Sequence, residues 1–398
     1  MSDRTPSQQA ALERSAALEE QVLVAPGKFR VLTGDRPTGP LHIGHYLGTL
    51  ANRVRLQDLG VEVIVLIADY QVMTDQQASR QLPATVRGVV ADYLAAGIDP
   101  DRSTIFTHSA VPALNELVLP FLSLVSDAEL HRNPTVKAET EATGRPPTGL
   151  MLTYPVHQAA DILFCHANLV PVGLDQLPHL ETTRLIARRF NERYANRSPL
   201  FPEPDALLTA NPMLAGLDGR KMSKTRGNGI ALHATEDQTA AMIRRAPTDS
   251  ERRITYDPLT RPAVANLLDL LGAAIGKDPR HLADEIGNGG AGRLKQMLAE
   301  AVNELLRTLR RRRAELAEDI SYLDSVLDTG NARARLLADQ TLTKVHDLLG
   351  MTYANRTSHS RPSPGSPMLP NRAVGSGRTQ GDAATGRDRI GRASAAQR

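Results

Sequence analysis

The sequence predicts an α/β fold, in which a doubly wound parallel sheet is followed by an all-helical C-terminal region. Two observations carry this prediction. Short apolar runs typical of buried strands alternate with longer helical patterns in the first half of the chain, which is the order that produces a parallel sheet. Beyond residue 230 the strand signals stop, and apolar residues recur only at helical spacing.

Length and composition indicate a large globular protein of more than one domain. The chain has 398 residues, of which 41% are hydrophobic, so it can bury a sizeable core and exceeds one ordinary domain. No apolar run approaches the length that spans a bilayer, and the polar, charged N-terminus is unlike a signal peptide. We therefore expect a cytoplasmic protein with no membrane contact. The single cysteine, Cys165, excludes an internal disulfide framework and a cysteine-based metal cluster.

Four buried strands are predicted in the α/β part, separated by helical patterns. They lie at residues 29–33, 63–68, 103–107 and 169–173. Ahead of the first strand, a loosely helical spacing of apolar residues predicts a helix over 8–23, outside the catalytic core. In open parallel sheets ligands bind beyond the carboxyl ends of the strands, so residues that follow each strand are candidate site residues.

The helical region combines an apolar stripe with many arginines. The stripe consists of Leu294, Met297, Leu298, Ala301, Val302, Leu305 and Leu309. Apolar residues have a similar helical spacing in 261–276 and 333–350. Arginines suited to a phosphate backbone are Arg244, Arg245, Arg252, Arg253, Arg307 and the run 310–313. The alternative is a solvated helix face paired with acidic residues such as Glu315 and Glu318. From residue 356 onward Pro, Gly, Ser and Arg dominate, which predicts a disordered basic tail.

The first chemical motif follows the first predicted strand. The segment from Gly34 runs through Asp35, Arg36, Pro37 and Thr38 to His42-Ile43-Gly44-His45, where a helix begins. The N-terminus of a helix presents unpaired backbone N–H groups and a positive dipole end, which makes it an anion site. His42 and His45 lie three residues apart, so both rings share one helix face and can donate to phosphate oxygens. The alternative is that the two histidines are caps or core residues.

The second motif is the basic loop Lys221-Met222-Ser223-Lys224, which continues with Thr225. Glycines on both sides of this loop predict a hinged flap that closes over a phosphate-bearing ligand. Such a loop combined with His-x-Gly-His far upstream resembles the two signatures of class I aminoacyl-tRNA synthetases. The usual last residue of the loop signature is Ser, so the hydroxyl of Thr225 is a small departure.

Further segments resemble the tryptophanyl-tRNA synthetase family. They are residues 153–163 and 170–176, extended by His179, Glu181 and Arg184, and the resemblance covers roughly residues 29–353. It implies a Rossmann-like catalytic domain at 29–230, preceded by an N-terminal extension at 1–28. It also implies a helical anticodon and tRNA-binding domain at 231–355, followed by the tail at 356–398.

The resemblance also implies the reaction, its partners and the role of each site residue. L-tryptophan is activated with ATP and transferred to tRNA(Trp) by a homodimer, with Mg²⁺ bound to ATP and not to protein ligands. Family residues that act on the phosphates correspond to His42, His45, Lys137, Lys221 and Lys224. ATP contacts correspond to Gly34, Asp35, Arg36, Pro37, Thr38, Gly44, His45, Gly173, Asp175, Met222, Ser223 and Thr225. Tryptophan contacts correspond to Asp161, Tyr154, Gln176, Gln158 and Gln71, and the Asp161 carboxylate accepts the indole N–H.

Three positions depart from the usual family pattern. Gln71 stands where many members have His, Gln158 stands where many have Met, and Asp35-Arg36-Pro37 replaces Arg-x-Gln-Pro. These changes resemble a subgroup of the same family and alter the polarity of the pocket. For Gln71 the alternative is a loop cap, and for Asp161 it is a helix-surface or capping carboxylate.

Three alternative functions share part of this pattern. A tyrosyl-tRNA synthetase has both signatures, but it usually has Tyr at the position of Ala160 and Gly-Gly-Ser-Asp-Gln at 172–176. A small-molecule adenylyltransferase normally ends after the α/β domain. A non-catalytic RNA-binding paralogue has no reason to keep His42, His45, Lys221 and Lys224.

Overall fold

The computed structural model describes residues 6–74, 81–134, 136–137, 146–195, 197–208, 214–222 and 226–353. Residues 1–352 form one compact unit. The predicted disordered tail at 356–398 lies outside the described residues. Among the helices of this described part, none is long and apolar enough to cross a membrane.

The centre of the unit is a five-stranded parallel sheet with the order β3-β2-β1-β4-β5. The strands are β1 (Arg30–Asp35), β2 (Glu62–Ile67), β3 (Thr104–Thr107), β4 (Leu169–Val172) and β5 (Asp205–Leu208). This is the strand order of a Rossmann-like doubly wound sheet, so the predicted fold class is confirmed. The sequence prediction missed β5, whose short apolar run directly follows a segment interrupted by Pro202 and Pro204, which reads as a loop.

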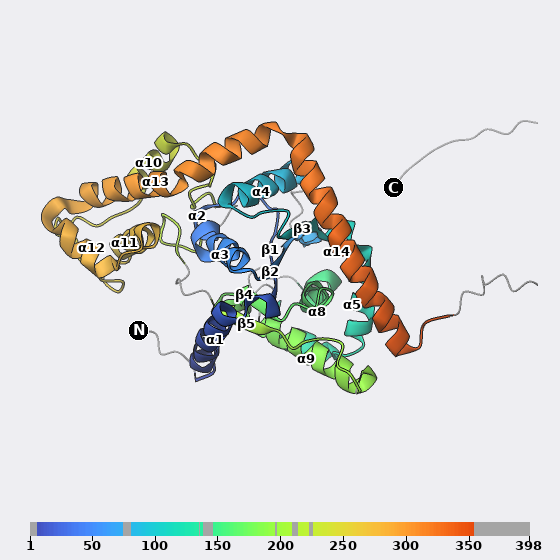
Figure 1. Cartoon of the computed structure of the whole chain (residues 1–398). Coiled ribbons are helices and arrows are strands. Elements are labelled where there is room, and N and C mark those ends of the chain that lie inside the picture. Colours follow the sequence, from blue (N-terminus) through green and yellow to red (C-terminus); the bar gives the residue numbers. More distant parts are fainter. Residues whose placement is uncertain are drawn as a thin grey trace, which may run out of the picture. The chain divides into compact units, whose positions relative to one another are not determined.

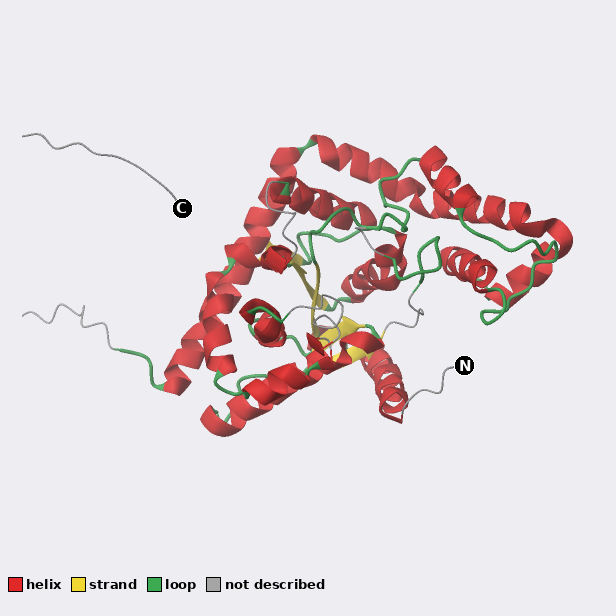
Figure 2. Cartoon of the chain, turned by 180° about the vertical axis from the view of Figure 1, so that it is seen from behind, coloured by secondary structure: helices red, strands yellow, loops and turns green. Residues whose placement is uncertain are grey.

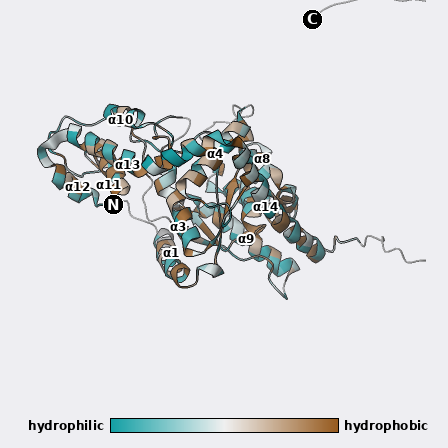
Figure 3. Ribbon diagram, turned by 45° about the horizontal axis from the view of Figure 1, so that its top comes forward, coloured by the Kyte–Doolittle hydropathy of each residue, from teal (hydrophilic) through white to brown (hydrophobic). Residues whose placement is uncertain are grey.

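Alternate strand residues point to two separate cores, as the two-residue period of a strand requires. Val31, Val63 and Val65 face one core, while Leu32 and Ile64 face the other. The strands are mostly brown in Figure 3, whereas the helices carry both colours. Because both faces of the sheet are buried, its strands read as continuous apolar runs.

Helices cover both faces of the sheet (Figures 1 and 2). The first core contains residues of α3 (Ala51–Leu59) and α4 (Leu82–Ala96). The second core contains residues of α5 (Pro112–Leu122), α8 (Gly149–Leu163) and α9 (Leu177–Tyr194). Shorter elements are η1 (Pro26–Lys28), α2 (Ile43–His45), η2 (Tyr46–Leu50), η3 (Asp69–Thr74), η4 (His108–Ala110), α6 (Asp127–Arg132), η5 (Leu174–Gln176) and η6 (Gly287–Gly289).

The N-terminal helix α1 (Pro6–Val24) contributes to the hydrophobic core, and its place outside the catalytic core stays a prediction. Leu18 and Val22 are buried in the first core cluster. The backbone N–H of Leu208 in β5 donates to the Ser15 hydroxyl at 2.8 Å. The helix therefore packs on the last strand of the sheet, where the unpredicted β5 creates the surface that it covers.

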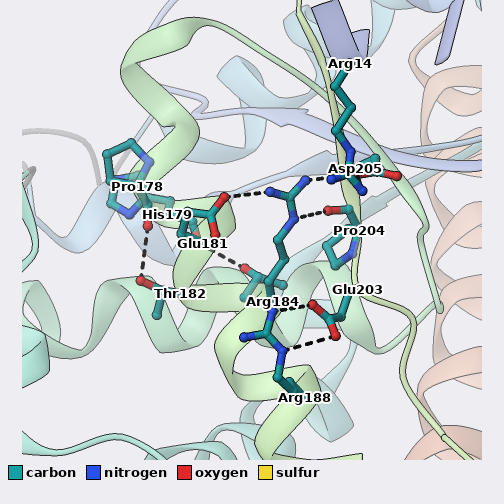
Figure 4. Close-up of polar contacts among 11 residues, drawn as sticks. Arg14, Pro178, His179, Glu181, Thr182, Arg184, Arg188, Glu203, Pro204 and Asp205 are labelled. Atoms are coloured by element: carbon teal, nitrogen blue, oxygen red, sulfur yellow. Dashed lines mark hydrogen bonds and ion pairs between the residues drawn. The ribbon is translucent and has the colours of Figure 1, made fainter. Parts of the chain in front are cut away.

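Arg184 links three elements at this side of the sheet (Figure 4). From α9 it donates to Glu181 at 2.6 Å, to the Pro204 carbonyl at 2.7 Å and to Asp205 at 3.1 Å. Arg14 of α1 forms an ion pair with the same Asp205 carboxylate at 2.8 Å. The contacts of Arg184 and Arg14 thus fix the start of β5 between α9 and α1.

The region after the basic loop is helical, as predicted. It consists of α10 (Glu236–Arg245), α11 (Pro262–Ile275), α12 (Pro279–Ile286), α13 (Gly290–Glu318) and α14 (Ile320–Leu349). The predicted stripe on α13 is buried at Leu294, Leu298, Val302 and Leu309. These residues belong to the same core cluster as α4 and one face of the sheet, so the helical region shares its core with the α/β part.

Helix α14 returns along the sheet and covers its β3 edge (Figure 1). A Cβ atom on Gly330 would lie 1.8 Å from the Ile105 carbonyl oxygen, so only glycine permits this approach. The N–H of Thr107 donates to Asn331 Oδ1 at 3.0 Å, which satisfies a backbone donor at the end of the edge strand.

Two of the arginines predicted to meet a phosphate backbone are instead internal. Arg310 donates to Asn303 at 2.8 Å and to Thr239 at 2.7 Å, and Arg313 pairs with Asp92 of α4. The expectation is wrong for these two residues, because helical spacing turns Arg310 toward α10 and Arg313 toward α4. Arg244, Arg245, Arg252, Arg253 and Arg307 are exposed, and their role stays a prediction.

Candidate active site

The first motif lies at the carboxyl end of β1. The strand approaches β2 so closely at Gly34 that a Cβ atom there would lie 2.4 Å from the Leu66 carbonyl oxygen. The Asp35 carboxylate points inward and accepts hydrogen bonds from Arg53 at 2.6 Å and Tyr93 at 2.7 Å. The Asp35 carboxylate therefore stabilises the fold through Arg53 and Tyr93. Contact between the Asp35 backbone and ATP stays a prediction.

The loop then leads through Arg36, Pro37 and Thr38 to the two histidines. His42 stands at the N-terminus of α2 with extended backbone, and its N–H donates to His45 Nδ1 at 3.2 Å. The two ring centroids are 3.8 Å apart. His42 is buried and His45 is half-buried, so the predicted shared face of the two rings is confirmed.

The base of the second motif is held by Asn228. Its side-chain amide donates to Asp218 Oδ1 at 2.8 Å and to the Lys221 carbonyl at 3.2 Å. Gly219 and Gly227 adopt left-handed conformations with φ of 76° and 62°, which favour glycine. Lys221 is exposed. The sequence prediction recognised the glycines but overlooked Asn228, which ties the two ends of the loop together.

Direct backbone contacts join the two motifs. Leu232 N–H donates to the Leu41 carbonyl at 2.9 Å, and Ile43 N–H donates to the Ile230 carbonyl at 2.8 Å.

Two glycines allow side chains of one motif to pack on the other. A Cβ atom on Gly44 would lie 2.7 Å from the Met222 sulfur, and one on Gly229 would lie 3.0 Å from the His42 ring. Motifs more than 170 residues apart in sequence therefore form one site, with Met222 packed against the turn that carries His42 and His45.

For several residues predicted to contact the phosphates or the ribose of ATP, the role stays a prediction. Ser223, Lys224 and Thr225 lie outside the described residues, as does the side chain of Asp175. Lys137 is described and exposed, and Gly173 directly follows β4. Their roles stay predictions.

Asp161 is a buried member of a hydrogen-bonded pair. It lies on α8 with 2% of its surface exposed, and its Oδ1 is 2.7 Å from His108 Nε2. A carboxylate only accepts hydrogen bonds, so Nε2 carries the proton and donates. The interpretation of Asp161 as a surface or capping carboxylate is therefore wrong. His108 was missed by the sequence prediction, although its place directly after β3 was the available signal.

The charges around His108 perturb its ionisation. Burial alone lowers the pKa of His108, but the Asp161 charge, their hydrogen bond and the Asp69 charge together raise that pKa above its ordinary value. For neighbouring His157, burial outweighs the charge of Asp161 and the pKa is lowered. Of the two rings, His108 is thus the one that more readily carries a positive charge beside Asp161.

His108, His157 and Asp161 also have the composition of a small metal site. One potential ligand atom from each lies within 4.8 Å of the others, and all three residues are buried. The 2.7 Å separation of His108 and Asp161 is that of a direct hydrogen bond, so these two groups satisfy each other.

The other predicted tryptophan contacts surround this pair in different ways. Tyr154 and Gln158 lie seven and three residues before Asp161 on α8, so the three share one helix face. The Gln158 Oε1 atom is buried without a hydrogen-bond partner among the described residues. Gln71 accepts from Arg36 at its carbonyl at 3.2 Å, which joins the loops after β1 and β2. Gln176 ends η5 beyond β4.

Fold and site define a class I tRNA synthetase. The chain belongs to the family "tRNA synthetases class I (W and Y)", whose model matches residues 25–307. The names of curated relatives specify one enzyme within this family. A Tryptophan--tRNA ligase of Streptococcus pneumoniae is 41% identical over 341 residues, which cover 82% of this chain and 98% of the relative. That of Treponema pallidum is 41% identical over 335 residues, which cover 81% and 97%.

Solved structures agree with this family. Tryptophanyl-tRNA synthetase from Campylobacter jejuni, complexed with ADP and tryptophan, matches with a TM-score of 0.69 and 31% identity over 81% of this chain and 99% of that chain. Tyrosyl-tRNA synthetase from Archaeoglobus fulgidus matches with a TM-score of 0.59 at 22% identity, which supports the fold alone.

Proposed function

We propose that this chain is a tryptophan–tRNA ligase. It activates L-tryptophan with ATP to tryptophanyl-adenylate and pyrophosphate, and then transfers tryptophan to the 3′ end of tRNA(Trp). The observation that carries the specificity is the buried Asp161 carboxylate, on one helix face with Tyr154 and Gln158. Such an acceptor suits a ring N–H, because a substrate without that donor would leave a desolvated carboxylate poorly satisfied. The names of the curated relatives and the tryptophan complex of the Campylobacter enzyme support the same substrate.

The activation step needs positioning more than protein nucleophiles. An oxygen of the tryptophan carboxylate attacks the α-phosphorus of ATP, and the bond to the pyrophosphate oxygen breaks. We assign His42 and His45 to the charge that develops on the α-phosphate, and Lys221, Lys224 and Lys137 to the departing pyrophosphate. The contact between Met222 and the His42 turn supports this assignment, since it brings the two motifs together.

The second step transfers the activated amino acid. A hydroxyl of the terminal tRNA ribose attacks the adenylate carbonyl, and AMP leaves. Exposed arginines of the helical region, such as Arg244 and Arg252, are suited to the tRNA phosphates. We further propose a cytoplasmic homodimer, in keeping with the family.

Mg²⁺ would arrive on ATP. The described side chains of the two signatures, His42, His45 and Lys221, carry no carboxylate and fit phosphate oxygens better than a divalent cation, while the nearby Asp218 carboxylate accepts from Asn228. The ion would neutralise phosphate charge, while these residues orient the phosphates.

Amino-acid-dependent exchange between pyrophosphate and ATP tests the function. The full-length chain is assayed with each of the twenty amino acids, and exchange with tryptophan alone is expected. Exchange with tyrosine would assign the chain to the sister specificity. Exchange with no amino acid would favour a non-catalytic paralogue.

A further inference from the structure

We propose that His108 is a positioning residue for Asp161 and thereby determines selectivity for a side chain with a ring N–H donor. The imidazole binds one carboxylate oxygen, Oδ1, and leaves Oδ2 to accept from the substrate. This inference rests on the proposed function, because it assumes that Asp161 meets the indole ring. It adds a residue from a different part of the chain, 53 positions before Asp161.

The first argument is the isolation of the pair from solvent. The side chains of His108 and Asp161 are 0% and 3% exposed, and their hydrogen bond is 2.7 Å long. A buried carboxylate needs a hydrogen-bonded partner to offset its lost hydration. Since Oδ1 receives a donor, the carboxylate is fixed in rotation and its second oxygen remains an acceptor.

The second argument is that the backbone on both sides of His108 is itself fixed. Asp69 of η3 accepts from the Ser109 N–H at 3.0 Å and also from the Ser109 hydroxyl. Arg335 of α14 donates to the Ala110 carbonyl at 2.8 Å on this same side, and on the other side Asn331 of α14 accepts from the Thr107 N–H.

These contacts come from η3 and α14, two elements far apart in the chain. The imidazole is therefore a rigid support for the carboxylate, of the kind that a precisely placed acceptor requires.

The third argument concerns the surroundings of the imidazole ring. The Tyr70 ring lies nearly parallel to it at a centroid distance of 6.0 Å, and the His157 ring lies 4.7 Å away. The charged or titratable groups that face His108 are Asp161 and His157 from α8 and Asp69 and Tyr70 from η3. The two carboxylates stabilise the imidazolium form, so burial does not remove the donor.

The test compares tryptophan with an isostere that lacks the donor. L-tryptophan and 3-benzothienyl-L-alanine, in which sulfur replaces the ring N–H, are assayed by pyrophosphate–ATP exchange with the full chain. For His108→Leu we expect the ratio of the two kcat/KM values to fall by about tenfold or more. The loss should lie in KM for tryptophan, with kcat nearly unchanged, because the contact is made in the ground state as well.

Conservative and matched variants separate positioning from folding. His108→Gln places an amide N–H where imidazole Nε2 stands, so it should keep most of the ratio. His157→Leu makes the same change on a neighbouring buried ring that has no hydrogen bond to Asp161 among the described contacts, and it should also keep the ratio. If His108→Leu does not fold, His108→Asn takes its place, because its amide is too short to reach Oδ1.

The outcomes distinguish this inference from the function on which it rests. If Asp161→Ala loses selectivity and His108→Leu keeps it, or if His157→Leu loses as much as His108→Leu, the role of His108 is overturned. If Asp161→Ala keeps the ratio, Asp161 does not read the ring N–H and the inference falls with it. If the unmodified chain activates no amino acid, the proposed function itself fails.

Discussion

Arg313 on α13 forms an ion pair with Asp92 on α4, and the same carboxylate accepts the backbone N–H of Leu41 at 3.2 Å. Leu41 directly precedes His42. Asp92 is fully buried, while 19% of the Arg313 side chain is exposed. One carboxylate thus connects the helical region to the loop that carries His42 and His45.

Arg313→Leu should destabilise the fold by about 3–5 kcal/mol, because it leaves the Asp92 charge buried without its ion partner. Urea unfolding of Arg313→Leu, Asp92→Asn and the double variant measures this coupling. The double variant should recover part of the loss. Strictly additive effects would show that the two residues do not interact energetically.

His45→Ala should raise the activation free energy of adenylate formation by several kcal/mol and leave tryptophan binding nearly intact. The reason is that the His45 contact forms as charge builds on the phosphate. Pyrophosphate–ATP exchange gives the rate. The chain contains no tryptophan, so the change in L-tryptophan fluorescence on binding can be followed without tryptophan emission from the protein. Equal losses in binding and rate would contradict a role confined to the transition state.

Arg53→Met should cost about 3–5 kcal/mol of unfolding free energy, because it leaves the Asp35 carboxylate without its cation in the core. Tyr93→Phe is the milder comparison, since it removes only the 2.7 Å hydrogen bond to Asp35 and should cost about 1.5–3 kcal/mol. Urea denaturation measures both. A loss in Tyr93→Phe as large as in Arg53→Met would show that the ion pair is not the dominant contact.

Gly330→Ala should destabilise the protein and displace α14 from β3, because the added methyl group would overlap the Ile105 carbonyl. Gly292→Ala is the matched control. It lies in α13 with nothing within 4 Å of the added atom, so it should stabilise by up to about 1 kcal/mol. Thermal unfolding measures the stability of the two variants. If Gly330→Ala did not change the stability, α14 would be able to shift away from β3 without an energetic cost.

Glu129→Gln should change the pH dependence of stability. The hydrogen bond from Arg189, followed by that from the Ser126 backbone, lowers the pKa of Glu129 from 4.5 to about 2. The stabilisation from the charged form is therefore present above about 4.5 and lost as pH falls through about 2.

Because the pair is partly exposed, with 37% of the Arg189 and 27% of the Glu129 side chain accessible, the difference between Glu129→Gln and the unmodified chain should stay below about 1 kcal/mol. It should shrink on acidification. Gln keeps the capping hydrogen bond to the Ser126 N–H, so the pH-dependent part isolates the charge. A difference that grows at low pH in urea titrations would refute this assignment.

Much of the architecture followed from local pattern. The strands at β1 to β4 are buried on both faces, so their apolar runs are unambiguous, and the α13 stripe is long enough to show its period. β5 was missed because its short apolar run follows Pro202 and Pro204, which read as part of a loop. The predicted division at residue 230 stays a prediction, since α13 and the sheet share one core.

The sequence by itself determined the class of chemistry, since His-x-Gly-His after a strand and the Lys221 loop specify phosphate handling by residue type and spacing. Only the tertiary structure decided which residues meet. It paired Asp161 with His108, turned Asp35 toward Arg53, and directed Arg313 to Asp92 instead of a nucleic acid. The reason is physical: a local pattern fixes which face of an element a side chain occupies, but partners across the core depend on how distant elements pack.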